Sequence, residues 1–268
     1  MKIKFLCAAA AVATAFASTA AFAEDAPAAA APTPDFTITG SVAIASQYRF
    51  RGISQSDNKP VVQGAITVSH KSGFYVSTWA SSASAGNSAV NIGGTEIDVY
   101  GGYTAPIAKT GITIDGGLYG YLYPGSATAN NGISGNYYEI YGSLTKAIGP
   151  VSVKAGVNFA PKQAYFNDYN TKSKSNAYKY LEATFAVPST PVTLHGHVAH
   201  SAGGFNFAKE YVDYNVGAGY KFKALTLDVS LVGTNISRSD ATKAPVTTAN
   251  ETYRAGKPVA VVSLTAAF

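Results

Sequence analysis

Apolar and polar residues alternate with a period of two, again and again, from residue 36 to the C-terminal Phe268. Because successive side chains of a β-strand point to opposite faces, each alternating run predicts a strand with one apolar and one polar face. Twelve such runs are visible, at residues 36–50, 61–70, 74–82, 95–103, 111–122, 137–146, 151–159, 177–187, 192–200, 211–222, 225–234 and 257–268.

The connections between these runs are short and long in turn. The long ones lie at residues 51–60, 83–94, 123–136, 160–176, 201–210 and 235–256. Short turns at one end and long loops at the other are typical of an outer-membrane β-barrel. With an even number of antiparallel strands, both termini then lie on the periplasmic side.

A soluble β-sandwich with one buried face gives the same alternation, so the height of the aromatic residues decides between the two folds. Aromatic residues of the apolar phase gather at the short-turn end (Phe36, Phe74, Tyr103, Tyr220, Phe222, Phe268) and at the long-loop end (Tyr48, Phe50, Tyr138, Phe159, Tyr214). Two aromatic belts around an aliphatic band fit the two interfaces of a bilayer. The sequence therefore predicts an all-β fold, a transmembrane up-and-down antiparallel β-barrel of about 12 strands with short periplasmic turns and long extracellular loops.

The N-terminal residues predict export. Lys2 and Lys4, a following apolar stretch and the A-x-A site Ala21-Phe22-Ala23 mark residues 1–23 as a secretory signal peptide. Residues 24–35 are rich in Ala and Pro and predict a flexible lead-in, which leaves residues 36–268 for the barrel. Cys7 lies within the signal peptide, so the mature chain has no cysteine.

Composition excludes two further classes. No run of about 20 apolar residues occurs, which argues against a helical membrane protein. The formal net charge of +5 falls to +3 when Lys2 and Lys4 are removed with the signal peptide, leaving 18 basic against 15 acidic residues. This excess is too small and too scattered to indicate a nucleic-acid partner.

One stretch of the sequence resembles a known family. It comprises SQYRFRGISQSD at residues 46–57, then Lys59-Pro60, Gln63-Gly64, Gly73-Phe74-Tyr75, Trp79, Glu96-Ile97-Asp98 and Gly101-Gly102-Tyr103. Together these residues resemble the TorF family of outer-membrane porins. Ala80-Ser81 follow Trp79 where the family tends to have Gly or Ser and then Asn. The resemblance implies an outer-membrane barrel of Gram-negative bacteria with a porin role, and it supplies no catalytic or ligand residues.

Charged residues of the polar phase are the candidate pore-lining residues. They are Arg49, Arg51, Glu96, Asp98, Asp115, Glu139, Lys154, Glu182, Asp213 and Asp228. Two interpretations stay open: the charges pair across the lumen and stiffen the barrel, or they form a constriction that selects solutes. With Lys221 added, seven carboxylates face four bases, which favours cations or neutral solutes. Lysines in the loop at 160–176 oppose this preference, so the sign of selectivity stays open.

The size of the barrel leaves both an open and a closed lumen available. Eight strands give a filled interior and 16–18 a wide aqueous channel, so about 12 allows a narrow pore or a plug formed by an external loop. Inward tyrosines either fill space or line a path for sugars; they are Tyr75, Tyr100, Tyr119, Tyr121 and Tyr141.

Three histidines are candidates for a metal site or a reactive site. His195 and His197 share one strand face, but no third ligand is identifiable, so no metal and no cofactor is expected. His200 is followed by Ser201, which would suit a lipid-surface hydrolase. Adjacent strand residues point to opposite faces, however, so we expect no enzyme.

The predicted function is a porin-like channel for passive diffusion of small hydrophilic solutes or ions across a bacterial outer membrane. The alternative is a plugged structural or adhesive barrel that acts through its extracellular loops. The expected partners are outer-membrane lipids, small hydrophilic solutes and the barrel-assembly machinery, which would recognise the final strand ending in Phe268.

Overall fold

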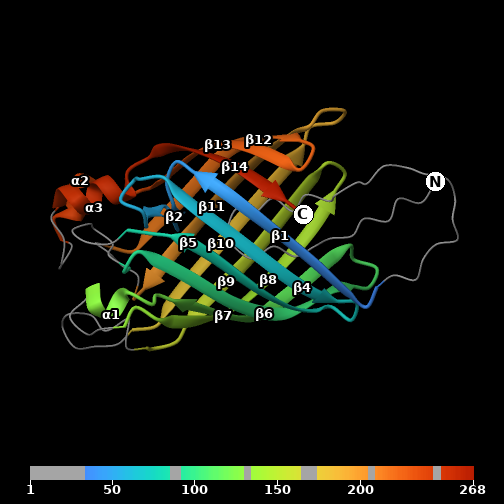
Figure 1. Cartoon of the computed structure of the whole chain (residues 1–268), viewed down its shortest axis with the longest axis horizontal. Helices are drawn as coiled ribbons and strands as arrows, with labels where there is room; N and C mark the ends of the chain where they lie inside the picture. The colour runs from blue at the N-terminus through green and yellow to red at the C-terminus, as the bar shows by residue number, and fades with distance from the viewer. Residues whose placement is uncertain (1–33, 85–91, 130–133, 164–173, 205–208, 244–248) are drawn as a thin grey trace, which may run out of the picture.

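The computed structural model describes residues 34–84, 92–129, 134–163, 174–204, 209–243 and 249–268. The predicted signal peptide and residues 24–33 of the predicted lead-in lie outside these residues. The described chain forms one closed antiparallel β-barrel of twelve strands, which confirms the predicted fold (Figure 1). The barrel strands are β1 (Phe36–Ala45), β4 (Val61–His70), β5 (Phe74–Ser82), β6 (Thr95–Ile107), β7 (Ile112–Leu122), β8 (Tyr137–Ile148), β9 (Val151–Ala160), β10 (Asn176–Ala186), β11 (Val192–Gly203), β12 (Tyr211–Phe222), β13 (Leu225–Thr234) and β14 (Val259–Ala267).

Every barrel strand pairs with its neighbours in the sequence of strands, and β14 closes the barrel against β1. The closing register places Ser41 opposite Ala267. The terminal Phe268 extends it, since its N–H donates to the Gly40 carbonyl at 2.9 Å and its carbonyl accepts from the Gly40 N–H at 2.8 Å. The last residue therefore belongs to the barrel seam.

The exterior of the barrel is apolar. Outward side chains such as Ile38, Leu118 and Val216 are 58–67% exposed, and similar residues surround the wall. Water-soluble proteins rarely expose a continuous apolar surface of this extent, whereas a bilayer covers it. Strands of 9–13 residues match the length that a tilted strand needs to cross a membrane. Aromatic pairs such as Phe74 and Tyr103, with ring centroids 4.9 Å apart, mark the short-turn end.

The helical elements lie at the opposite end, called here the long-loop end (Figure 1). They are α1 (Ser126–Ala129), α2 (Arg238–Ala241) and α3 (Ala249–Gly256). The alternation pattern predicts a loop at residues 235–256, but Ser237 and Asp240 form a reciprocal capping box that starts α2. Among the described residues, no helix is long and apolar enough to cross a membrane.

The first predicted strand, 36–50, is too long, because β1 ends at Ala45. The chain then turns inward and forms a small hairpin of β2 (Arg49–Phe50) and β3 (Ile53–Ser54). Tyr48 and Phe50 were predicted in the outer aromatic belt, and this is wrong. Tyr48 is buried against Trp79 at 5.2 Å between ring centroids, and Phe50 contacts Tyr121 at 5.6 Å.

Candidate functional site

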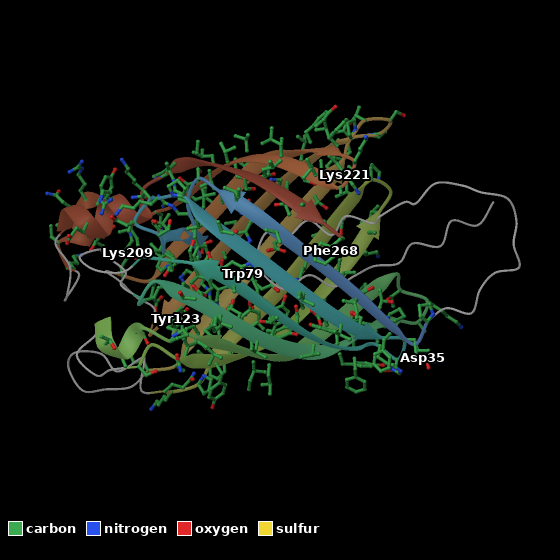
Figure 2. All side chains as sticks on the ribbon, viewed as in Figure 1. Asp35, Trp79, Tyr123, Lys209, Lys221 and Phe268 are labelled. Atoms are coloured by element: carbon green, nitrogen blue, oxygen red, sulfur yellow. The ribbon has the colours of Figure 1, made fainter. Side chains whose placement is uncertain are left out.

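The lumen contains a cavity of about 820 Å³. Its lining starts at residues of the short turns, Gly149, Pro150 and Pro191, and ends at Arg49 and Arg51 of the β2–β3 hairpin. Lys221 and Trp79 also line the cavity. Figure 2 shows Lys221 toward the short-turn end and Trp79 nearer the middle of the barrel. The cavity therefore occupies the part of the lumen between the short turns and the hairpin.

Residues 46–60, called here the crossing loop, connect β1 to β4 and carry the hairpin. Arg51 at its tip contacts Glu139 of β8, with its Nη2 2.8 Å from Oε1 and 2.6 Å from Oε2. β8 is the fifth strand from β1 in one direction around the barrel and the seventh in the other. The crossing loop therefore reaches almost to the opposite wall.

Glu139 is fully buried, and three groups hold its carboxylate. Besides Arg51, Tyr121 Oη donates to Oε2 at 3.1 Å and Asn158 Nδ2 donates to the same oxygen at 2.9 Å. The guanidinium of Arg51 also lies 4.1 Å from the centre of the Tyr178 ring on β10. A buried ion pair with this many additional partners fixes the loop tip in one position.

Gly52 is needed at the tip because of its backbone and its surroundings. It has a φ of 77°, which side-chain-bearing residues rarely adopt. A Cβ built there would lie 2.6 Å from Thr234 Cγ2 and 2.8 Å from the Gly233 carbonyl oxygen. The loop backbone therefore touches the β13 wall directly.

Tyrosines fill the lumen beside the crossing loop. The tyrosine cluster, defined as Tyr119, Tyr121, Tyr123, Tyr137 and Tyr141, packs around Ile53 of the loop. Its rings stack closely, with Tyr121 and Tyr137 centroids 4.3 Å apart. Tyr119 also stacks on Tyr100 at 4.5 Å. In the described structure these tyrosines fill space and support the loop.

The tyrosine cluster also supplies hydrogen bonds to buried carboxylates on β6. Tyr119 Oη donates to Asp98 Oδ2 at 2.8 Å, and Tyr123 Oη donates to Glu96 Oε1 at 3.1 Å. Asp98 lines the cavity, whereas Glu96 and Glu139 do not, because the loop and the tyrosines separate them from it.

Arg49 serves the crossing loop rather than a carboxylate. Its Nη1 donates to the carbonyls of Ala255 at 2.6 Å and Gly52 at 2.9 Å, and its Nη2 donates to Asn58 Oδ1 at 2.8 Å. Asp57 forms an ion pair with Arg254 of α3. The described part of the 235–258 segment is thereby tied to the crossing loop.

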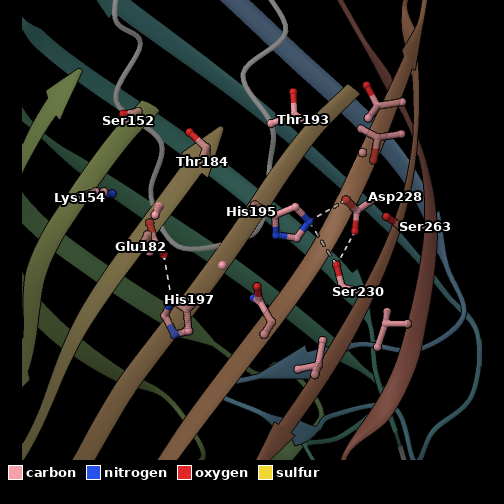
Figure 3. Close-up of a pocket in the computed structure, with 18 of the residues that line it drawn as sticks. Ser152, Lys154, Glu182, Thr184, Thr193, His195, His197, Asp228, Ser230 and Ser263 are labelled. Carbon is pink, nitrogen blue, oxygen red and sulfur yellow. Dashed lines mark hydrogen bonds and ion pairs between the residues drawn. The ribbon is translucent and has the colours of Figure 1, made fainter. Parts of the chain in front are cut away.

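Below the loop, β11 and β13 carry a histidine, a carboxylate and a hydroxyl in contact (Figure 3). His195 Nε2 lies 2.9 Å from Asp228 Oδ2, and Ser230 Oγ donates to Asp228 Oδ1 at 2.5 Å. Ser230 approaches the same Nε2 at 3.4 Å. A catalytic triad needs the acid and the nucleophile on different ring nitrogens, so this arrangement has no free base for Ser230.

His197 occupies the centre of a second network. Its Nδ1 lies 3.2 Å from Glu182 Oε1, and its Nε2 lies 3.2 Å from Asp213 Oδ1. Tyr178 Oη also donates to Asp213 Oδ1 at 3.0 Å. Both ring nitrogens thus face carboxylates, which suits the doubly protonated imidazolium. Lys154 lies opposite Glu182 in the register of β9 and β10.

The remaining sequence candidates are distributed as follows. Asp115 lines the cavity and accepts from Tyr75 Oη at 2.8 Å. His200 is exposed on the outside while Ser201 is buried, so the two cannot act together. No group of three or more His, Cys, Asp and Glu side chains in the described part of the chain could hold a metal ion.

Some residues that build this site are not among the candidates predicted from the sequence. Tyr178 links Arg51 to Asp213, and Asn158 supports Glu139. Both lie on the inward phase of their strands, which was the available signal. The neighbours that give them a role come from other strands and could not be read from local pattern.

A family model describing a bacterial protein of unknown function (Gcw_chp) matches residues 29–268. The chain belongs to this family. No curated protein matches the chain.

Solved outer-membrane channels share the architecture of this Gcw_chp chain. The NanC porin has a TM-score of 0.55 at 11% identity, covering 87% of this chain and 99% of its own. The KdgM porin in complex with disordered oligogalacturonate has a TM-score of 0.52 at 11% identity, covering 87% and 99%. An outer-membrane channel from Pseudomonas putida has a TM-score of 0.48 at 12% identity, covering 91% and 99%. At these identities the likeness to the two porins shows the fold alone.

Proposed function

We propose that the protein is a porin-like channel in a bacterial outer membrane that lets small hydrophilic solutes or ions diffuse passively. The observation that carries the proposal is a cavity of about 820 Å³, with charged and hydroxyl side chains in its lining, inside a wall whose outside is apolar. A lipid-covered barrel with a polar interior provides a path for solutes that the bilayer excludes. The resemblance to TorF porins at residues 46–103 is in line with this function.

The same proposal gives the barrel its orientation and partners. The short turns and both termini would face the periplasm, and the crossing loop and helices would face the outside. Outer-membrane lipids would cover the wall, and the assembly machinery would read the final strand with Phe268. The proposed role is not enzymatic.

A plugged structural or adhesive barrel is the second candidate, and one observation favours it. The crossing loop, with the tyrosine cluster and α3 attached to it, occupies the lumen at the long-loop end. In that case the exposed loops would do the binding and the barrel would serve as their support.

Single-channel recording separates the two candidates. Purified wild-type protein in a planar bilayer should give discrete conductance steps, and Arg51→Met, which releases the loop tip, should give larger ones. A silent wild type with a conducting Arg51→Met variant would favour the plugged barrel. Silence of both proteins would contradict the channel. A salt gradient across the same bilayer gives the sign of ion selectivity.

A further inference from the structure

Several of the charged groups that line the cavity already contact one another. Asp228 contacts His195, and His197 lies between Glu182 and Asp213. At the boundary of the cavity next to the crossing loop, Arg51 forms an ion pair with Glu139. Asp98 and Asp115 line the cavity as well, and they accept hydrogen bonds from Tyr119 and Tyr75. An ion that enters the cavity therefore meets carboxylates that already have partners, which offer less in return for its lost hydration.

Neutral hydroxyl groups, in contrast, are available. Six residues form what we call the hydroxyl ring: Thr145, Ser152, Thr184, Thr193, Thr226 and Thr265. They line the cavity from six different strands near the short-turn end, and all are half-buried. None of them hydrogen-bonds to another described residue through its side chain. Each hydroxyl can donate one hydrogen bond and accept two.

The register brings members of the hydroxyl ring together. Ser152 and Thr184 are directly opposite each other on β9 and β10, and Thr226 and Thr265 are opposite on β13 and β14. Figure 3 shows Ser152, Thr184 and Thr193 along one side of the cavity, next to the His195 and His197 networks. Pairs of adjacent hydroxyls suit a ligand that itself presents hydroxyls on neighbouring atoms.

The part of the cavity next to the crossing loop also has an aromatic residue in its lining. Trp79 lines it from β5, packed on Tyr48, and keeps 7% of its surface exposed. Aromatic rings present an apolar face next to polar edges. Such a face complements the C–H surface of a sugar ring.

We propose that the cavity binds an uncharged polyhydroxylated solute of the sugar class through the hydroxyl ring and Trp79. The proposal deepens the proposed function, since it rests on solutes entering the lumen. A sugar that binds replaces each hydrogen bond to water by a hydrogen bond to a side chain of the hydroxyl ring. A charged analogue of the same size loses more hydration and meets charged side chains that already have partners, so we expect it to bind more weakly.

The chain contains a single tryptophan, Trp79, so its fluorescence reports on this cavity alone. Purified barrel in detergent is titrated with glucose and maltose, and with glucosamine and gluconate as cationic and anionic analogues at equal ionic strength. We expect a saturable change with the neutral sugars and at least about tenfold weaker binding of both charged analogues. Calorimetry in parallel detects binding that leaves Trp79 unperturbed.

The double variant Thr184→Val, Thr226→Val replaces two hydroxyls by methyl groups of similar size. Loss of two hydrogen bonds should weaken maltose binding about tenfold or more. Thr104→Val is the matched control, because its hydroxyl is already bonded to the Ile114 carbonyl at 3.1 Å and does not line the cavity. It should bind maltose like the wild type.

Several results would overturn the proposal: no maltose binding by either method, equal binding of a charged analogue, or unchanged binding by the double valine variant. The channel function is judged separately by conductance. Sugar binding without conductance would keep the solute class and defeat the channel. Conductance without sugar binding would keep the channel and defeat the solute class.

Discussion

Arg51 and Glu139 are 88 residues apart in the chain and form a buried ion pair across the lumen. One comes from the crossing loop after β1 and the other from the distant wall strand β8. This contact ties a loop of the long-loop end into the barrel interior. It therefore decides how much of the lumen remains for solutes.

Removing the charge of Arg51 should destabilise the barrel and widen the path. Arg51→Met leaves Glu139 buried without its cation, so we expect a loss of about 3–5 kcal/mol in unfolding free energy. Unfolding in urea from detergent or vesicles measures the loss. The double variant Arg51→Met, Glu139→Gln should recover part of it, because Tyr121 and Asn158 can still bond the amide.

Lys59→Met is the control for that series. Lys59 lies in the same loop, but its ion pair with Asp57 is 3.7 Å long and its side chain is 75% exposed. Exposed pairs contribute little to stability. A control variant as unstable as Arg51→Met would show that the loop tolerates no change, which would remove the argument from the buried pair.

A methyl group at Gly52 should prevent the crossing loop from seating. Gly52→Ala combines a left-handed backbone with overlap against Thr234, so we expect a cost of about 3 kcal/mol and larger conductance steps. Gly149→Ala is the control, because its φ of 59° is similar but nothing lies within 4 Å of its Cβ position. It should cost about 1 kcal/mol and leave conductance unchanged. Equal effects of both substitutions would mean that backbone strain, and not contact with β13, matters at Gly52.

Deleting Phe268 should slow closure of the barrel. The deletion removes two backbone hydrogen bonds to Gly40 at the β1–β14 seam and an aromatic ring 70% exposed on the outside. We expect a larger fraction of the chain to stay unfolded at each time of refolding than in the wild type. The shift in electrophoretic mobility between unheated and heated samples measures this fraction. Val262→Ala on the same strand removes apolar surface but no seam bond. If it slows closure as much as the deletion, then burial in lipid rather than the seam limits folding.

An ion pair outside the membrane should depress one carboxyl pKa. Lys209, with its Nζ 2.7 Å from Asp240 Oδ2, and the hydrogen bonds from Ser237 hold the pKa of Asp240 well below its usual range. Because the folded pKa is the lower one, the pair stabilises the α2 segment above the ordinary Asp pKa. That contribution fades as pH falls toward the folded value. Carboxyl ¹³C NMR should show a low midpoint that rises in Lys209→Met. A midpoint that the substitution leaves in place would exclude Lys209 as the main cause.

The alternation along each strand predicts which face is apolar and outward and which faces the lumen. Strand alternation is a local property with a period of two, so Ile38 and Leu118 could be placed outside, and Asp115 and Glu182 inside, before any contact was known. The same alternation predicts the aromatic belts that contain Phe74 and Tyr138. The capping box at Ser237 and Asp240 is equally local and was available in the sequence.

The contacts of the inward residues, in contrast, depend on the closed barrel. Tyr48 and Phe50 continue the alternation of β1, yet the chain bends inward after Ala45, where the hairpin can bury them against Trp79 and Tyr121. Arg51 can form an ion pair with Glu139 only because closure of the barrel brings β8 opposite β1. Such pairings depend on strand order, register and barrel width together, and no local pattern contains them. For the same reason, the division of the lumen into a filled end and a hydroxyl-lined cavity emerges only when all twelve strands are closed.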